Sequence, residues 1–258
     1  MIEIRAVHKE FTKGERRVVA LEEIDLTVAE REFVAILGPS GCGKSTLLNM
    51  VAGFDLPTRG SVKVAGDEIV APAPSRGVVF QEPALFPWLT VMDNVVFGPK
   101  TRGQSAADYR ARAAQIIEAV GLSGFETSYP AELSGGMRQR VGIARVLIME
   151  PKVLLMDEPF GSLDAQTRTL MQELLLALWE RHHQTVLFIT HDIEEAVLLA
   201  DRVCVMTARP GRIKKSIEVR MPRPRSIELT TSPEFNALRR EVLELIRQES
   251  LRAAMERV

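Results

Sequence analysis

Short apolar runs recur along the chain and predict a series of β-strands. Several runs are unbroken by polar residues, which is typical of strands buried on both faces of a mostly parallel sheet. Gly14 predicts a turn between the first two strands. In chain order, strands are expected at residues 2–7, 18–21, 24–28, 33–37, 77–80, 153–156, 186–189 and 203–206, with a short hairpin at 61–70.

Helices are expected between these strands. One should begin at Lys44 and end at Gly53, because glycine is a favoured C-cap. Residues 105–150 are predicted to be mostly helical, and a last helix is predicted over 233–254. The alternation of strands and helices indicates an α/β core with a mostly parallel sheet. Residues 85–150 are expected to form a helical subdomain inserted into this core.

Composition narrows the function classes. The chain has 258 residues, a formal net charge of −1 and 26% charged residues, so no basic excess draws it toward nucleic acid. It has two cysteines, too few for a disulfide framework or a cysteine-rich zinc site. No stretch approaches the roughly 18 apolar residues of a membrane-spanning helix. These features predict a soluble, cytoplasmic protein that does not bind nucleic acid and reaches a membrane only through a partner.

A glycine-rich segment between a predicted strand and a predicted helix fits the phosphate-binding pattern G-x-x-x-x-G-K-[ST]. Glycines let the backbone wrap around phosphate, and the following helix presents its positive end. Lys44 is expected to bridge the β- and γ-phosphates of ATP, and Ser45 to hold Mg²⁺. Cys42 is expected to react with maleimide unless MgATP protects it. The candidate nucleotide-binding residues here are Gly38, Pro39, Ser40, Gly41, Cys42, Gly43, Lys44, Ser45 and Thr46.

Asp157 and Glu158 come directly after the predicted strand at 153–156. Ligands of open α/β sheets bind at the carboxyl ends of strands, so Asp157 is suited to Mg²⁺ and Glu158 to activating water as general base. Gln81 and His191 also follow apolar strands, and either could reach the γ-phosphate from the same sheet edge. Taken alone, each of these patterns is also typical of a solvated loop.

Residues 133–140, with the sequence LSGGMRQR, are similar to the signature motif of ABC transporter ATPases. The motif follows the phosphate loop and Gln81 and precedes Asp157, as in that family. Ser162-Leu163-Asp164 resembles the family's D-loop, and His191 its switch histidine. The resemblance spans nearly the whole chain. It implies a P-loop NTPase core with an N-terminal antiparallel β subdomain and the inserted helical subdomain.

The resemblance also implies ATP hydrolysis with Mg²⁺ at a dimer interface. A helix N-terminus opened by Ser134, Gly135 and Gly136 offers a hydroxyl, bare N–H groups and a positive dipole end, although an N-capped surface helix has the same features. In the family the signature of one copy closes over ATP held by the other copy, which implies a homodimer. Asp164 is carried over as a further nucleotide-site residue. The implied catalytic residues are Lys44, Gln81, Glu158 and His191, and the implied metal ligands are Ser45, Gln81 and Asp157.

Two positions depart from the usual family pattern. ABC ATPases usually stack adenine on an aromatic residue early in the chain, and Phe11 stands at the matching position. Phe offers a π-face but lacks the hydroxyl of the Tyr common there, and a buried strand-end Phe is the alternative. Met137 replaces a polar residue frequent after the signature glycines, and we expect activity to be retained because the glycines make the contact.

Four stretches resemble one branch of the family, the ATPases of nitrate, sulfonate and taurine importers: residues 78–88, 157–164, 190–196 and 209–213. These bacterial systems pair two ATPase copies with integral-membrane permease subunits and an extracytoplasmic solute-binding protein. The resemblance implies a peripheral location on the cytoplasmic face of the bacterial inner membrane. It further implies an ABC ATPase domain over 1–210 and a short C-terminal extension over 211–258. A lipid-trafficking ABC ATPase would carry the same motifs, whereas soluble ABC ATPases of ribosomes or DNA usually have further domains.

Residues 83–89, with the sequence PALFPWL, are unusually apolar for a loop, and two prolines disfavour regular structure there. Aromatic residues are favoured as interface anchors, so Phe86 and Trp88 are candidates for contact with the permease, which reaches this region in the family. The alternative is that they pack inward against the helical subdomain. Basic residues between 212 and 225 are predicted to form a solvated hairpin, with anionic lipid headgroups as an alternative partner.

Overall fold

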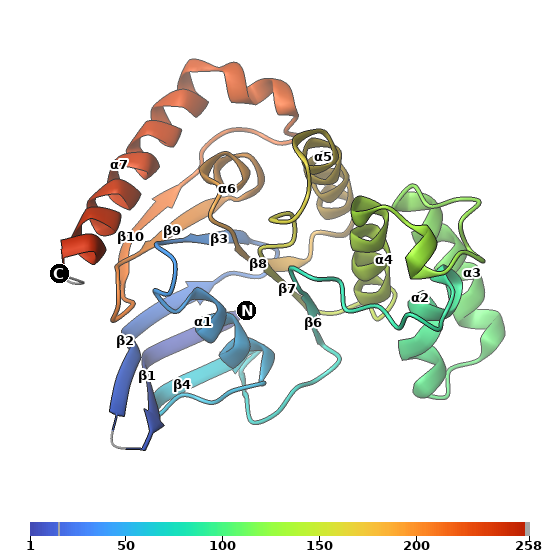
Figure 1. Cartoon of the computed structure of the whole chain (residues 1–258), viewed down its shortest axis with the longest axis horizontal. Coiled ribbons are helices and arrows are strands. Elements are labelled where there is room, and N and C mark those ends of the chain that lie inside the picture. Colours follow the sequence, from blue (N-terminus) through green and yellow to red (C-terminus); the bar gives the residue numbers. More distant parts are fainter. Residues whose placement is uncertain (15, 256–258) are drawn as a thin grey trace. The chain divides into compact units, whose positions relative to one another are not determined.

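The computed structural model describes residues 1–14 and 16–255, which form two compact units (Figure 1). The first unit combines residues 1–73 with the chain from His183 onward, and the second spans Pro74–His182. Each has its own buried apolar core, with Phe33 and Phe188 in the first unit and Phe160 in the second. Among the described residues, no helix combines the length and apolar character needed to cross a membrane.

The N-terminal part of the first unit is an antiparallel sheet with the strand order β2-β1-β4-β5. The strands predicted at 18–21 and 24–28 are a single bulged strand. Glu22 and Glu23 lie opposite His8 alone, and Glu23 has a φ of 50°. These two glutamates interrupt the apolar pattern, which is why the sequence predicts two strands. The strands are β1 (Ile2–Lys13), β2 (Arg16–Val28), β4 (Arg59–Val64) and β5 (Asp67–Glu68).

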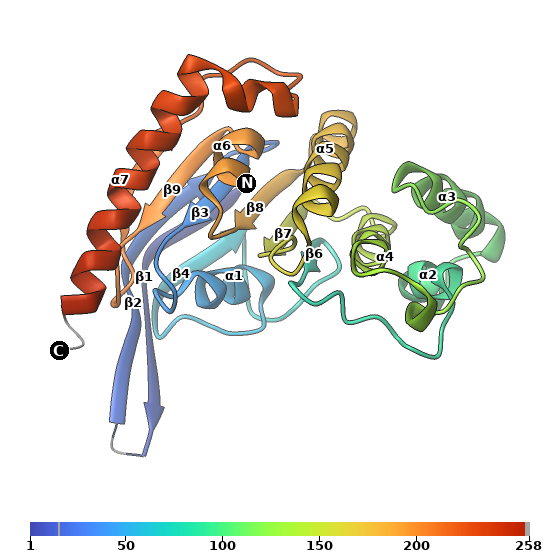
Figure 2. The same ribbon diagram turned by 45° about the horizontal axis from the view of Figure 1, so that its top comes forward.

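The second sheet of this unit is built on strands that the unbroken apolar runs predict. β3 pairs in parallel with both β8 and β9, and β10 pairs antiparallel with β9. Every residue of β3 and β8 is buried, as expected for strands covered on both faces. Helix α7 runs alongside β9 (Figure 2). The elements are β3 (Phe33–Leu37), α1 (Lys44–Ala52), β8 (Thr185–Ile189), α6 (Ile193–Leu199), β9 (Arg202–Met206), β10 (Ile213–Glu218), the 3₁₀ turn η2 (Ile227–Thr231) and α7 (Pro233–Met255).

The second unit contains two parallel strands and a group of helices. Helix α2 lies within the helical subdomain expected over 85–150, but no separate helix was expected at its residues, since Gly98 and Pro99 are poor helix formers. Its start does carry a helix signal, because the Thr90 hydroxyl accepts a hydrogen bond from the Asp93 amide. The elements are β6 (Arg76–Val79), α2 (Val91–Thr101), α3 (Ala106–Ala119), the 3₁₀ turn η1 (Pro130–Glu132), α4 (Gly135–Leu147), β7 (Val153–Asp157) and α5 (Ala165–His182).

The predicted fold class is confirmed, with a mostly parallel α/β core and an N-terminal antiparallel sheet. The helix predicted over 233–254 is α7. The division of the chain at residue 210 stays a prediction.

The basic segment at 212–225 is in part the solvated hairpin that was expected, since β10 pairs antiparallel with β9 and Arg212, Lys215 and Arg220 are exposed. Arg225 is buried and donates to backbone carbonyl oxygens, among them that of Ala200 at 2.6 Å. The other cations of the segment pair with carboxylates of the chain, so they leave little unbalanced positive charge for lipid headgroups. These pairs are Arg212 with Glu22 and Glu23, Lys214 with Glu249, Lys215 with Glu241, Arg220 with Glu218, and Arg223 with Asp201.

Candidate nucleotide-binding and hydrolysis site

The predicted phosphate loop connects the end of β3 to the start of α1 in the first unit. Gly41 and Gly43 have φ values of 76° and 104°, which residues with a Cβ rarely adopt. A Cβ on Gly43 would also lie 2.6 Å from a methyl carbon of Leu21. The Lys44 ammonium, in a side chain only 7% exposed, donates to the carbonyl oxygen of Gly38 at 2.9 Å. The loop and its lysine are therefore held in position by neighbouring backbone.

Cys42 lies inside this loop but is 1% exposed. Burial raises the pKa of its thiol, and the nearby Lys44 ammonium only partly offsets this effect. A buried, protonated thiol is a poor nucleophile, so the expectation of ready maleimide labelling at Cys42 is corrected. Cys204, in β9, is also buried.

His191 leaves the first unit's parallel sheet at the same edge as the phosphate loop. Ile189, the last residue of β8, pairs with Ile36 near the end of β3. The backbone around His191 is fixed by the start of α6, where the Asp192 carboxylate accepts the amide hydrogen of Glu194 at 2.8 Å. Parallel strands thus carry this histidine and the loop to one edge.

Phe11 lies on β1 in the first unit and is 45% exposed. The Lys9 ammonium lies 4.9 Å from its ring centroid, within cation–π distance. A partly exposed ring offers an apolar face for stacking, and the role of Phe11 toward adenine stays a prediction.

In the second unit, the side chains of Gln81 and Glu158 both lie close to Gly161. A Cβ placed on Gly161 would lie 3.1 Å from the Gln81 amide nitrogen and 3.7 Å from a Glu158 carboxylate oxygen. Asp157 ends β7, and Glu158 follows with a φ of 45°, an uncommon conformation for a residue with a side chain. Strained backbone of this kind is found preferentially at functional sites. Glycine at 161 leaves room for both polar side chains.

The predicted signature begins α4. The Ser134 hydroxyl caps the helix by accepting the Met137 amide hydrogen at 3.2 Å. Ser134 and Gly135 are exposed, whereas Gly136 is buried, and a Cβ there would lie 2.3 Å from a methyl carbon of Thr167. The helix start therefore has one open side and one side packed against α5.

Thr167 also fixes the D-loop aspartate. The Asp164 carboxylate accepts the amide hydrogen of Thr167 at 3.0 Å and its hydroxyl hydrogen at 2.7 Å. These hydrogen bonds hold the pKa of Asp164 below its usual value. Thr167 was not among the candidate residues, although Asp164 directly before α5 is a recognisable N-cap signal that predicts a hydrogen bond to the first turn.

The candidate residues therefore fall into two sets. The first unit carries Phe11, the loop from Gly38 to Thr46, and His191, and the second carries Gln81, Ser134, Gly135, Gly136, Asp157, Glu158 and Asp164. The proposed metal ligands Ser45, Gln81 and Asp157 are all oxygen donors. This set suits Mg²⁺, which is usually bound by few carboxylates together with substrate phosphates. Among the described residues there is no dense cluster of His, Cys, Asp and Glu that would suit a different metal.

Comparison with known proteins shows which family the chain belongs to. A family model described as ABC transporter matches residues 21–161. The aliphatic sulfonates import ATP-binding protein of Bacillus cereus is 46% identical, covering 94% of each chain. The nitrate import ATP-binding protein of a Synechocystis strain is 45% identical, covering 95% of each chain. The chain belongs to the ABC transporter family.

A solved structure extends the agreement to three dimensions. It is a dimeric ATP-binding cassette in a post-hydrolysis state with bound ADP and Pi, 33% identical in sequence. It matches with a TM-score of 0.76, covering 86% of this chain and all of that cassette. The protein is thus an ABC ATPase that binds and hydrolyses ATP, the ATP-binding subunit of a transporter.

Proposed function

We propose that this ATPase is the motor subunit of a bacterial importer for nitrate, a sulfonate, taurine or a related small solute. The observation that carries the proposal is near full-length identity above 40% to two ATPases named for sulfonate and nitrate import. These two relatives do not favour the lipid-trafficking or the soluble alternative. The subunit would sit on the cytoplasmic face of the inner membrane, beside an integral-membrane permease that receives solute from an extracytoplasmic binding protein.

We propose that each of the site residues has a separate role in the hydrolysis of ATP. The phosphate-loop amides and the Lys44 ammonium would bind the β- and γ-phosphates and offset their charge. Glu158 would accept the proton of a water whose oxygen attacks the γ-phosphorus, while the bond to the β–γ bridging oxygen breaks. Gln81, beside Glu158, would orient that water, and His191 would sense the γ-phosphate. Mg²⁺, when bound, supplies charge neutralisation for the leaving diphosphate, with Ser45, Asp157 and Gln81 as its ligands.

A homodimer would complete each site. Ser134 and Gly135 are exposed at the N-terminus of α4, where bare N–H groups attract anions. The nearest atom to a Cβ on Gly135 would be an Arg138 nitrogen 4.0 Å away, so the chain itself leaves this surface open. We propose that it closes over ATP held by the phosphate loop of a second copy, with Asp164 at the same interface.

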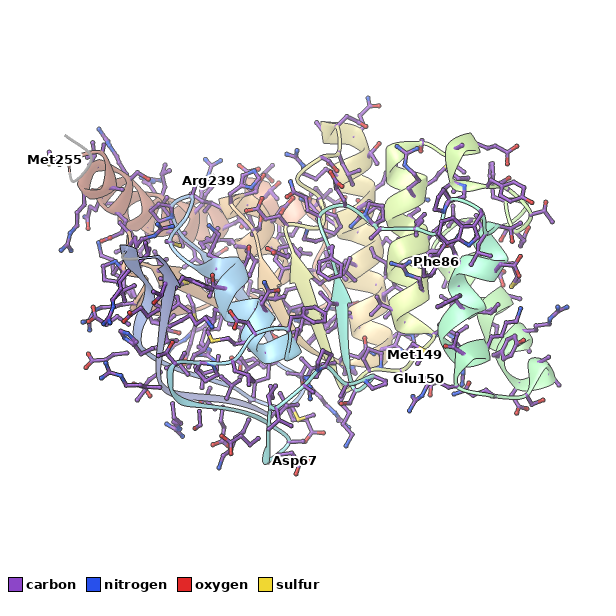
Figure 3. All side chains as sticks on the ribbon, turned by 60° about the horizontal axis from the view of Figure 1, so that its bottom comes forward. Asp67, Phe86, Met149, Glu150, Arg239 and Met255 are labelled. Atoms are coloured by element: carbon purple, nitrogen blue, oxygen red, sulfur yellow. The ribbon has the colours of Figure 1, made fainter. Side chains whose placement is uncertain are left out.

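The apolar loop at 83–89 supports a permease-docking surface. Phe86, labelled in Figure 3, is half-buried. Its ring centroid lies 4.5 Å from that of Phe97 and 5.7 Å from that of Trp88, and the Arg145 guanidinium lies 5.7 Å away. Trp88 is 70% exposed and stays available to a partner. The loop therefore combines parts of both sequence-based alternatives, because Phe86 is partly covered by neighbouring rings whereas Trp88 is largely exposed. A pocket of about 470 Å³ adjoins Trp88 and is lined by Trp88, Leu89, Asp93, Phe97, Lys100 and Thr101. We propose that a short cytoplasmic permease helix fills it.

Trp88→Ala tests this docking. It should leave ATP binding by the isolated subunit within about twofold of wild type, because the side chain is largely exposed. Pull-down with the permease should fall about tenfold or more, as expected for an aromatic interface anchor. Leu243→Ala, which removes an exposed apolar side chain from α7, serves as the control. Normal assembly of the Trp88 variant with the permease would contradict the proposed docking surface. The solute itself would be found by measuring ATPase stimulation of the reconstituted complex by nitrate, sulfonates and taurine.

A further inference from the structure

The turn between β9 and β10, residues 207–212, contacts the phosphate loop within the first unit, where β9 lies beside β3 (Figure 1). The Arg209 guanidinium donates twice to the carbonyl oxygen of Gly41, at 2.9 and 3.2 Å. A Cβ on Gly211 would lie 2.1 Å from the carbonyl oxygen of Cys42, so the turn touches the loop backbone there too. One turn far away in sequence thus hydrogen-bonds the first of two successive loop carbonyl groups and lies close against the second.

The turn is itself anchored on two sides. Gly211 exchanges backbone hydrogen bonds with β2, donating to Ala20 at 2.9 Å and accepting from Glu22 at 3.0 Å. On the other side, Glu249 of α7 is 3% exposed and accepts the Ala208 amide hydrogen at 2.9 Å. The same carboxylate pairs with Lys214 at 2.7 Å. The C-terminal helix and the N-terminal sheet together fix the turn that contacts the loop.

We infer that Arg209 is a positioning residue for nucleotide binding. A trans peptide is planar, so holding the Gly41 carbonyl outward fixes the Cys42 N–H on the opposite side. That N–H donates across the loop to the Pro39 carbonyl oxygen at 3.3 Å. Arg209 therefore maintains the loop conformation that presents N–H groups to phosphate, and it reduces the ordering cost of binding. The guanidinium acts through the loop, without contact with the reacting atoms.

The inference predicts an effect on affinity rather than on rate. Arg209→Ala should raise the KM for ATP about tenfold, the cost of losing hydrogen bonds to a charged group, and leave kcat within about twofold. Dissociation constants for ADP and for a non-hydrolysable ATP analogue should rise by the same factor. Arg209→Lys, which keeps one donor, should recover much of the affinity. Arg220→Ala is the matched control, because Arg220 is exposed and pairs with Glu218, and this variant should behave as wild type.

Several outcomes would overturn the inference. One is an unchanged KM in Arg209→Ala, and another is selective loss of the triphosphate, which would indicate direct contact with the γ-phosphate. A fall in melting temperature that Arg209→Lys does not reverse would indicate a merely structural role. The inference rests on the proposed role of the phosphate loop, which Lys44→Ala tests separately. If Lys44→Ala abolishes nucleotide binding while Arg209→Ala has no effect, only the positioning role fails.

Discussion

The phosphate loop and the signature segment are both glycine-rich helix N-termini, yet their surroundings differ. At the phosphate loop, a Cβ on Gly43 would lie 2.6 Å from Leu21, and the carbonyl oxygen of Gly41 is held by Arg209. At the signature, a Cβ on Gly135 would meet nothing closer than 4.0 Å. One anion site is enclosed by its own chain, and the other is open on the side that would face a ligand.

This difference separates the two steps of the ATPase cycle. An enclosed loop has its backbone donors fixed before ligand arrives, so a single copy can bind nucleotide. An open helix N-terminus attracts an anion by only about 0.3–1 kcal/mol, too little to hold a phosphate alone. It becomes effective when another surface supplies the rest of the site. We therefore expect binding to be a property of one copy and hydrolysis a property of two.

The largest expected effect separates these steps most sharply. Glu158→Gln removes the proposed general base, so hydrolysis should slow by about 10²-fold or more while nucleotide affinity stays near wild type. ATP-bound dimers should then accumulate, detectable by size-exclusion chromatography with ATP. Glu150→Gln, at an exposed glutamate of the same unit, is the control and should turn over normally. Wild-type turnover in Glu158→Gln would refute its role.

A smaller effect is expected at the open site itself. Gly135→Asp introduces a negative charge where an anion should bind, at a position where an added Cβ would lie 4.0 Å from an Arg138 nitrogen and so meets no clash. Hydrolysis should fall about tenfold or more through like-charge repulsion, while ADP binding by the monomer is unchanged. Gly135→Ala adds a methyl group without charge and should keep hydrolysis within about threefold of wild type. Equal rates in the two variants, or loss of ADP binding, would contradict an open, dimer-completed site.

The phosphate loop also illustrates which features the sequence can predict and which it cannot. The loop from Gly38 to Thr46 follows from local pattern, because its glycines, its lysine and the flanking strand and helix are contiguous. The buried strands β3 and β8 follow from unbroken apolar runs for the same reason. The contacts that hold the loop in place do not follow from local pattern, since Arg209 lies 168 residues from Gly41 along the chain. Contacts of that range depend on how strands and helices assemble, which local pattern does not encode.

Burial was a second limit on prediction from sequence. Cys42 was expected to be reactive because the loop must meet ATP, but its side chain points into protein and is buried. The basic residue Arg225 was expected in solvent and is buried against carbonyl oxygens. Residue type gives only an average tendency to be exposed, so individual side chains that pack under a loop escape it.

The smallest expected effect concerns the support behind the phosphate loop. Burial alone would raise the pKa of Glu249, but hydrogen bonds from Lys214 and the Ala208 amide, with the positive charges of Lys214 and Arg252, hold it below its usual value. A carboxylate with a lowered folded-state pKa stabilises the fold above its unfolded pKa of about 4.3, and this stabilisation is lost as pH falls through the folded pKa. Glu249→Gln should therefore reduce the free energy of unfolding by about 1 kcal/mol at neutral pH, and by less as pH falls below about 4.

Urea unfolding of wild type and variant between neutral and acid pH measures this difference. Glu241→Gln is the matched control, because Glu241 lies on the same helix and pairs with Lys215, also on β10, but its side chain is 44% exposed. An exposed ion pair contributes at most about 1 kcal/mol and often nothing, so its removal should change stability little at any pH. Only Glu249→Gln should differ clearly from wild type in its free energy of unfolding, and this difference should become smaller at acid pH. If the free energies of unfolding of wild type and Glu249→Gln differed by the same amount at every pH, the charge of Glu249 would not be what supports the turn. If Glu241→Gln lowered the free energy of unfolding as much as Glu249→Gln does, the exposed ion pair of α7 would support the turn as much as the buried one.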